Sequence, residues 1–538
     1  METGTKRHYL LVTLYLAILL ALISACVPAP KAAEPAKPAA GTEANAPAST
    51  AQPAAVSAPA GKKDLIVIQG SDVSKLDPHM STTDPDIKVS FNIFDNLLDR
   101  DQSLKLIPAL ATEWKSLDDL TWQFKLRQGV KFQNGDPFNA KDVKFSLDRT
   151  GPNGDPKAVT RAAFTSLDRV DIVDDYTVNV VTKFPDALMP DRLAFYGGQI
   201  IPKSYFDKVG ADEFNAKPVG TGPLKFVEWV KDDHLTLEAN KEWWGGKLGV
   251  ERVIVKPMPE SASRVAALLK GEADIITQLP PDDVDRVNKS ANAAALGVPY
   301  AGLYTIATVY NKPFPLNNNY FHQAMSLAID RQSIQKDLFR GRGVVPSGIY
   351  PQGDSAYDSS LPPMEYNPAK AKEMLQKAGY KGEEIIFQTT QGFMLNDKPM
   401  AEAIVTMFKD VGINAKIEVF EYSVRAQTQR DKAYKGLYWT DPTDIALDPD
   451  SMMWRNIGTG AVHDYWRNPD WDKLMQDARV TMDRAKRKAI YADANKVYQE
   501  YLPWIPVIQP LESYGAQRYI DWTPRANQDF VIQDVKLK

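Results

Sequence analysis

The sequence predicts an α/β protein in which sheets and helices form layered lobes. Strand-like segments, in which apolar and polar residues alternate, are interspersed along the chain with segments of helical periodicity. The length of 538 residues exceeds that of one ordinary domain and suffices for several buried cores. The composition, 44% hydrophobic and 25% charged, is ordinary for globular proteins and excludes a fibrous or wholly disordered chain.

The first residues of the chain predict export. Lys6 and Arg7 precede an apolar run over residues 9–23, and two small residues separate that run from Cys26. This order is typical of a secretory signal peptide, here expected over residues 1–25. Cys26 is the only cysteine, and its position resembles that of the lipobox cysteine of bacterial lipoproteins, which is diacylated and becomes the new N-terminus. An uncleaved membrane anchor is the alternative, since the apolar run approaches the length of a membrane span.

A spacer is expected over residues 26–63, beginning with the lipidated cysteine. Of the 37 residues from 27 to 63, 21 are Ala or Pro, and no apolar periodicity runs through them. Because repeated Pro prevents a continuous helix, we expect a disordered linker that lifts the folded part off a membrane.

The predicted elements of the first half follow in chain order. Residues 64–69 form a short β-rich run, which predicts a first strand. Residues 122–127 alternate apolar and polar side chains and predict a strand, and residues 130–132, after a glycine turn, predict its return strand. Residues 140–149 predict a helix with Asn139 as its N-cap.

The later segments continue this alternation of strands and helices. Residues 170–182 predict two strands around an Asp-Asp turn. The other predicted strands cover residues 274–277 and 414–420, and the other predicted helices cover residues 261–270, 320–338 with a break near Asp330, 367–379, 400–411 and 483–501.

Charge and motifs exclude several classes of function. Lys and Arg number 64 against 68 Asp and Glu, so the net charge of −4 argues against a phosphate-binding surface and against nucleic acid as a partner. One cysteine excludes internal disulfides and thiolate clusters, and the five histidines lie far apart, so we expect no metal and no cofactor. No phosphate-binding loop, H-E-x-x-H pair or G-x-S-x-G turn is present, which favours a binding protein over an enzyme.

Four separated groups of segments carry a resemblance to a known family. They are Leu76–His79 with Asn92–Leu98; Trp122–Phe132 with Gly135–Ser146; Gly220–Leu224 with Asn240–Gly245 and Arg264–Ile275; and Gln323–Arg331 with Tyr366–Leu375. In this order they resemble the extracytoplasmic solute-binding proteins of family 5, which supply oligopeptide, dipeptide and nickel ABC importers. The matches span about residues 64 to 510, which is nearly the whole folded part.

The resemblance implies a two-lobed, periplasmic-binding-protein-like α/β fold of class II with an extra subdomain on lobe I. Lobe I is expected to combine residues 64–95, 201–309 and 503–538, with residues 96–200 as its appended subdomain. Lobe II is expected to cover residues 310–502. A ligand would bind between the lobes, which would close over it.

The resemblance also implies a ligand contact in the stretch Leu437–Asp441. In peptide-binding members a Trp here forms a wall of the cleft and an Asp just after it receives the α-ammonium of the peptide, which matches Trp439, Thr440 and Asp441. A buried carboxylate suits that role because charge-assisted hydrogen bonds offset desolvation. Asp444 is an alternative to Asp441, and a core Trp439 is the structural alternative to a ligand contact.

Further site residues come from their positions in the family. Tyr422 corresponds to an aromatic wall in peptide-binding members. Thr82, Thr83 and Asp84 lie in a loop that can hydrogen-bond a peptide backbone. Gln278 is expected to face the cleft from lobe I. For each of them a solvated or purely structural role is the alternative.

This chain lacks an arginine that dipeptide-binding members of the family use to hold the ligand. Dipeptide-binding members carry an Arg before the helix that begins near Met400, where this chain has Gln391, Gly392 and Phe393. Without that bidentate cation, a longer peptide or a solute with an amine or a sugar-like polar face fits better than a dipeptide. The scattered histidines disfavour the nickel-binding branch.

The expected function is therefore that of a monomeric, lipid-anchored substrate-binding protein of an ABC importer. It would capture oligopeptides or related amine-bearing solutes outside the cytoplasm, in the periplasm or at the cell surface. It would then deliver them unaltered to a membrane permease that its ATPase subunits drive. The alternatives are an exported cell-surface hydrolase and a chemosensory binder that share the fold.

Overall fold

The computed structural model describes residues 57–59, 61–390, 394–420, 422–443, 447–454, 456–527 and 530–538. The predicted signal peptide, Cys26 and most of the predicted linker lie outside these residues. In the part of the chain that is described, no helix combines the length and the apolarity that a bilayer crossing demands.

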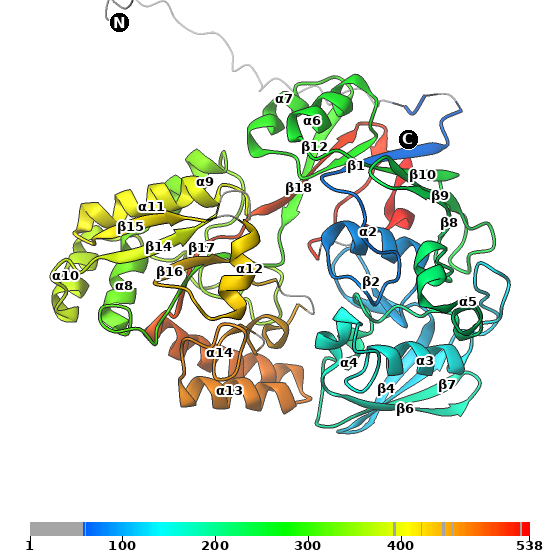
Figure 1. The fold of residues 1–538 in the computed structure, drawn as a ribbon, viewed down its shortest axis with the longest axis horizontal. Coiled ribbons are helices and arrows are strands. Elements are labelled where there is room, and N and C mark those ends of the chain that lie inside the picture. The colour runs from blue at the N-terminus through cyan, green and yellow to red at the C-terminus, as the bar shows by residue number, and fades with distance from the viewer. Residues whose placement is uncertain are drawn as a thin grey trace, which may run out of the picture. The chain divides into compact units, whose positions relative to one another are not determined.

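Lobe I is built on a seven-stranded mixed sheet (Figure 1). In sheet order its strands are β12 (Ala293–Pro299), β18 (Leu511–Gln517), β11 (Ile275–Thr277), β1 (Asp64–Gln69), β10 (Arg252–Pro257), β9 (His234–Ala239) and β8 (Leu224–Val230). The first strand, β1, is confirmed where it was predicted, and it pairs in parallel with β10 and β11. Its side chains alternate: Leu65 and Val67 pack into one hydrophobic core and Ile68 into another, so both faces of the sheet are covered.

The α-helices of lobe I are α2 (Asp84–Ile93), α5 (Lys203–Ala216), α6 (Ser261–Lys270) and α7 (Val284–Asn288). The predicted helix α6 ends at Gly271, whose φ of 80° is the left-handed conformation that glycine adopts without strain.

The appended subdomain carries a four-stranded antiparallel sheet. Its strands are β4 (Ala111–Asp118), β5 (Thr121–Leu126), β7 (Thr177–Thr182) and β6 (Leu167–Asp174), in sheet order, beside the hairpin β2 (Leu98–Arg100) and β3 (Leu106–Pro108) and the helices α3 (Ala140–Thr150), η1 (Val159–Phe164) and α4 (Met189–Arg192). The predicted cap of α3 is confirmed: Asn139 accepts a hydrogen bond from the Lys141 amide at 2.9 Å, and Asp142 accepts one from the Asn139 amide at 3.0 Å.

The predicted hairpin of residues 122–127 with 130–132 is wrong. β5 pairs with β4 and β7 instead. After Gly129 the chain folds back on itself, with the Phe138 amide donating to Val130 and the Phe132 amide to Asp136. The segment therefore pairs with the residues just after it, including an isolated bridge between Lys131 and Pro137, and not with β5.

Lobe II is built on a five-stranded sheet with the order β15 (Ala415–Val419), β14 (Ile385–Thr389), β16 (Leu437–Thr440), β13 (Tyr304–Thr308) and β17 (Trp504–Ile508). Its helices are α8 (Asn319–Ala328), α9 (Arg331–Leu338), α10 (Pro368–Ala378), α11 (Asp397–Val411), α12 (Tyr422–Arg430), the π-helical turn η3 (Asp450–Trp454), α13 (Pro469–Val480) and α14 (Arg484–Tyr501). The predicted break near Asp330 is confirmed, since Asp330 caps α9 by accepting from the Ser333 amide at 3.0 Å.

Two short segments cross between the sheets of the lobes. Residues 300–303 join β12 to β13, and residues 509–510 join β17 to β18 (Figure 1). The predicted boundaries assigned β13 and β17 to lobe I, whereas both strands pair within the sheet of lobe II. The buried side chain of Gln509 ties the crossings together, donating to the Tyr300 carbonyl at 2.7 Å and to the Gln352 carbonyl at 3.0 Å.

Candidate functional site

A cavity of about 680 Å³ opens between the two lobes, and we call it the crevice pocket. Its wall from lobe I and the appended subdomain comprises Thr82, Asp84, Ile87, Val159, Thr160, Ala162, Ala163, Phe195, Tyr196 and Asn527, and its wall from lobe II comprises Arg425, Gln429, Thr440, Asp441, Pro442, Thr443, Asn456, Val462 and His463. Ligand sites favour such interfaces because both walls can exclude water from a bound solute.

The N-terminus of α2 positions the wall of lobe I. Thr83 is the N-cap residue, and the Ser81 hydroxyl accepts from the Thr83 amide at 3.2 Å. Asp84 opens the helix, where the helix dipole favours a negative charge, and its carboxylate lies 2.6 Å from the Lys88 ammonium one turn later. Burial opposes the charge of Lys88, but Asp84, Tyr514 and Glu512 raise its pKa above the usual value. The carboxylate of Asp84 is therefore held in place by a buried cation.

The end of β16 positions the wall of lobe II. The strand pairs with β13, and the Thr305 hydroxyl donates to the Thr440 carbonyl at 3.2 Å. Because successive side chains of a strand point to opposite faces, Thr440 lines the crevice pocket while Trp439 points into the core of lobe II. The Trp439 indole packs on Phe387 at 5.2 Å between ring centroids and donates to the Asp397 carbonyl at 3.0 Å.

Asp441 follows directly after β16 and lies half-buried on the pocket wall. Burial raises the pKa of its carboxyl to about 6, and the nearby Arg425 offsets part of that rise. Burial and then the charge of Asp441 raise the pKa of Tyr300 and of Tyr304 above the usual range. The charge of Asp441 therefore also reaches these two tyrosines.

The structure brings together four of the predicted site residues. Thr82 and Asp84 from lobe I and Thr440 and Asp441 from lobe II all line the crevice pocket. Thr83 lies next to this group as the cap of α2.

The other predicted site residues lie elsewhere. Trp439 is in the core, and Gln278 is exposed after β11 with a φ of 53°, outside the residues that line the pocket. The side chain of Tyr422 lies outside the described residues, as do Asp444 and residues 391–393.

Sequence reasoning missed a cation in lobe II. Arg425 and Gln429 line the pocket from α12. Their spacing of four residues places them on one face of a helix, a signal visible in the sequence but tied to no predicted element. His463 was also missed; its Nδ1 atom lies 2.8 Å from the Tyr438 hydroxyl.

The lobe II wall of the crevice pocket carries both an acidic and a basic side chain. Asp441 can accept hydrogen bonds from an ammonium group, and Arg425 can donate to a carboxylate. Within the described residues, no three His, Cys, Asp or Glu side chains gather as metal ligands would. The arrangement suits the binding of a polar, charged organic solute.

Comparisons with known proteins agree with this arrangement. A sequence profile described as bacterial extracellular solute-binding proteins, family 5 Middle, matches residues 105–464. Di/tripeptide-binding protein 2 of Pseudomonas aeruginosa is 28% identical over 445 residues, covering 77% of this chain and 83% of that protein. The glutathione-binding protein GsiB of Pectobacterium atrosepticum is 29% identical over 461 residues, covering 82% of this chain and 88% of that protein.

A solved structure shares the fold. The ABC transporter-associated periplasmic binding protein DppA from Helicobacter pylori, in complex with the peptide STSA, matches with a TM-score of 0.75 and 25% identity, covering 88% of this chain and 98% of that chain. This likeness confirms the predicted two-lobed class II fold. With two thirds of its length matched by the family profile, the chain belongs to the bacterial extracellular solute-binding proteins of family 5.

Proposed function

We propose that this protein is the substrate-binding component of an ABC importer and that it captures peptides with a free α-amine in the crevice pocket. The observation that carries the proposal is the half-buried Asp441 on the wall of a cavity between two lobes. The relatives named for di- and tripeptide and for glutathione binding, and the neighbour solved with a bound peptide, support it.

The electrostatics of Asp441 explain the preference for an amine. Burial raises its pKa to about 6 because the carboxylate has lost water. An ammonium group in the pocket restores favourable partners to the ionised form, so binding the ligand recovers much of that desolvation. On the same wall, Arg425 provides a partner for a carboxylate, so the charges of a zwitterionic peptide are both met.

The delivery of the solute belongs to the same proposal. A diacylated Cys26 would hold the protein at the outer face of a membrane, since each buried lipid CH₂ contributes about 0.8 kcal/mol and two chains make attachment durable. The spacer would let the monomeric folded part reach a permease while its lobes remain free to close. The protein itself would leave the bonds of the solute unchanged.

Calorimetric titration of the purified folded part tests the proposal. A tripeptide with a free amine is expected to bind one to one, and its N-acetylated form at least tenfold more weakly. Asp441→Asn is expected to remove most of that difference. Mass spectrometry should recover the peptide intact, and its cleavage would favour the hydrolase alternative. Equal affinity of the free and acetylated peptides would overturn the assignment of Asp441.

A further inference from the structure

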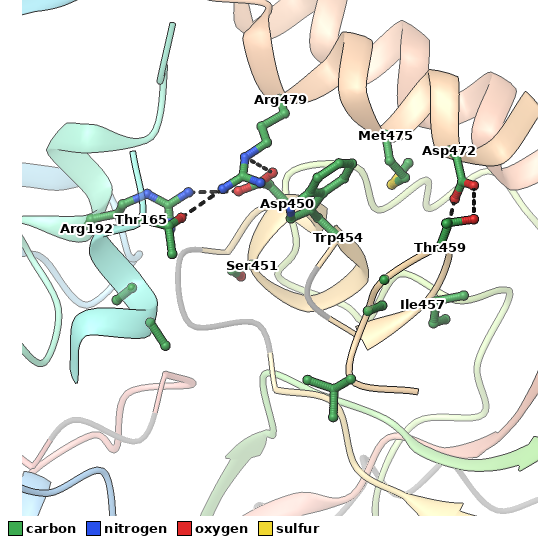
Figure 2. A pocket seen from close by; sticks show the side chains of 15 residues that line it. Thr165, Arg192, Asp450, Ser451, Trp454, Ile457, Thr459, Asp472, Met475 and Arg479 are labelled. Carbon is green, nitrogen blue, oxygen red and sulfur yellow. Dashed lines mark hydrogen bonds and ion pairs between the residues drawn. The ribbon is translucent and has the colours of Figure 1, made fainter. Parts of the chain in front are cut away.

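Arg479, on α13 of lobe II, reaches across to the appended subdomain. Its Nη2 atom donates to the Thr165 hydroxyl at 3.1 Å, and its guanidinium carbon lies 4.9 Å from the ring centroid of Phe184. Figure 2 looks into a cavity of about 380 Å³ that Arg479 and Thr165 line from the two lobes. One side chain of lobe II therefore makes both a hydrogen bond and a cation–π contact with the appended subdomain.

The same guanidinium also has partners in its own lobe. Its central carbon lies 4.8 Å from the ring centroid of Trp454, and its Nε atom is 3.7 Å from Oδ1 of Asp450 (Figure 2). The Arg479 side chain is only 13% exposed. These contacts hold the guanidinium at the surface of lobe II that faces the appended subdomain.

The neighbouring charges are paired so that the lobes can part without leaving one of them alone. Across the lobes, Arg192 donates to Oδ2 of Asp450 at 2.8 Å. Arg192 also binds Asp186 of its own subdomain at 3.0 Å. In lobe II, Asp450 keeps Arg479 beside it. Each side therefore retains one acid and one base after separation, which avoids the large cost of an unpaired buried charge.

The contacts that Arg479 makes across the lobes are weak enough to be reversible. A cation–π contact and a hydrogen bond to a hydroxyl each contribute little in water. Thr165 is exposed and Phe184 is half-buried, so water can replace Arg479 at both residues. Small contributions of this kind shift an equilibrium between open and closed lobes, because the free energies of the two forms differ little.

This contact region is separate from the crevice pocket. The lining of that pocket includes neither Arg479 nor its partners Thr165, Phe184, Trp454 and Asp450. The chain itself supplies every group involved, so the contribution of Arg479 to closure is the same whichever solute is bound.

We propose that Arg479 is a latch, which populates the closed form in the absence of any solute and slows the release of every solute by the same factor. The latch consists of the contacts of Arg479 with Thr165 and Phe184. Its effect on release rests on the proposed function, whereas its effect on the free protein does not. A latch of this kind sets the affinity from a surface that the solute does not touch.

A variant of the receiving surface tests the latch without disturbing lobe II. Phe184→Leu combined with Thr165→Val removes both contacts, and Arg479 keeps Asp450 and Trp454 beside it. Single-molecule energy transfer, with one dye on the appended subdomain and one on lobe II, measures the share of closed molecules without peptide. That share is expected to be measurable in the unmodified protein and to fall about threefold or more in the variant. An equal share in both proteins would overturn the latch.

The control variant changes the same two residue types in the same subdomain. Phe145→Leu combined with Thr112→Val replaces a half-buried Phe and an exposed Thr whose contacts lie within lobe I. Phe145 packs on Phe206 at 5.3 Å between ring centroids, and the Thr112 hydroxyl donates to the Lys125 carbonyl at 3.3 Å. The control should keep the closed share of the unmodified protein, and an equal loss in both variants would overturn the latch.

Release of bound peptide gives a second measurement. Stopped-flow dilution measures the dissociation rates of tri-alanine and tri-leucine from the unmodified protein and from the latch variant. Both rates are expected to rise about fivefold in the variant, so the ratio of the two affinities stays within about twofold. A rise for one peptide only would show a contact with that peptide and would refute a latch that acts on every solute.

The latch and the proposed function fail in different ways. If no peptide binds, but the closed share still falls in the latch variant, the proposed function is refuted and the latch in the free protein stands. If the peptides bind and lose affinity in Asp441→Asn, but the latch variant behaves like its control, only the latch is refuted.

Discussion

Arg192 of the appended subdomain and Asp450 of lobe II form an ion pair across the two lobes, with 2.8 Å between Nη2 and Oδ2. A second pair joins Arg484 of lobe II to Asp191 of the appended subdomain at 2.6 Å. Both aspartates are buried, and each also lies near an arginine of its own side, Arg100 for Asp191 and Arg479 for Asp450. We call these two cross-lobe pairs the clasp.

The clasp is expected to support ligand affinity, because separating the lobes would break both pairs. Arg484→Gln removes one pair but leaves Asp191 bound to Arg100 at 2.7 Å. Since the Arg484 side chain is 63% exposed, the unfolding free energy should change by less than about 1 kcal/mol. Peptide affinity should fall about threefold in calorimetry, and the fall should shrink at high salt. An affinity equal to that of the unmodified protein would show that the clasp does not contribute to binding.

Arg192→Ala is expected to act on folding instead. Arg192 also pairs with Asp186 at 3.0 Å, and this contact lowers the pKa of Asp186 although burial alone would raise it. Removing the guanidinium takes a counter-ion away from two buried carboxylates, those of Asp186 and Asp450. The unfolding free energy should therefore fall by about 3–5 kcal/mol. Chemical denaturation measures this loss, with Arg484→Gln as the control that should lose far less.

Asp441 predicts a pH dependence of binding. Its pKa is raised from 3.8 to about 6, so the carboxyl becomes neutral as the pH falls through 6 and its attraction for an ammonium group is lost. The affinity for peptides with a free amine should therefore decline between pH 7 and pH 5 in calorimetry. Asp441→Asn should bind weakly at both values, and a wild-type affinity that is flat with pH would contradict the role of Asp441.

The raised pKa of Asp441 also predicts that, without ligand, Asp441→Asn is more stable than the unmodified protein. Because the folded-state pKa of about 6 lies above the ordinary 3.8, ionisation of Asp441 opposes folding above pH 6, and this penalty vanishes as the pH falls toward 3.8. Asp441→Asn should thus melt at a higher temperature than the unmodified protein at pH 7, and at a similar temperature at pH 4. If an ion pair stabilised the ionised Asp441 in the unliganded protein, Asp441→Asn would instead melt at a lower temperature than the unmodified protein at pH 7.

Trp439 is expected to matter for stability and not for binding. Trp439→Phe loses the hydrogen bond to the Asp397 carbonyl and part of the packing against Phe387. The unfolding free energy should fall by about 1–3 kcal/mol, while peptide affinity stays within twofold. A large loss of affinity with unchanged stability would instead support the predicted role of Trp439 in the cleft wall.

Cys26 is expected to attach the protein to a membrane. Cys26→Ser should leave the protein in the soluble fraction after expression in a bacterium with lipoprotein processing, because the acylated sulfur is lost. Fractionation with an antibody measures this. Continued membrane association would favour the uncleaved anchor.

Local patterns in the sequence predicted local structure well. The capped helix α3, the break before α9 and the strand β1 each follow from residues near one another in the chain. The pairing of β5 failed because its neighbour β4 was not predicted: β4 is mostly exposed and shows no clear apolar alternation, although only two residues separate it from β5. The other partner, β7, lies further along the chain, and local spacing does not identify it.

The site was predicted in part, and its errors have physical causes. The carboxylates Asp84 and Asp441 were found because the family resemblance marks their segments, and both line the pocket. Trp439 could not be oriented, since a four-residue strand with two buried faces carries no polar alternation that marks the pocket side. Arg425 was missed because no element was predicted over α12, and the packing that brings this helix to the pocket is not marked by any local pattern.

Gln509 lies where the two segments that connect the lobes meet. Its single amide group bridges both crossing segments, so an axis of rotation between the lobes would run beside it. A rotation between the lobes would separate the surfaces near Arg484 and Asp191, which belong to different lobes and now lie 2.6 Å apart. Two fluorescent dyes attached to these surfaces, one on each lobe, would report such a rotation as a change in resonance energy transfer.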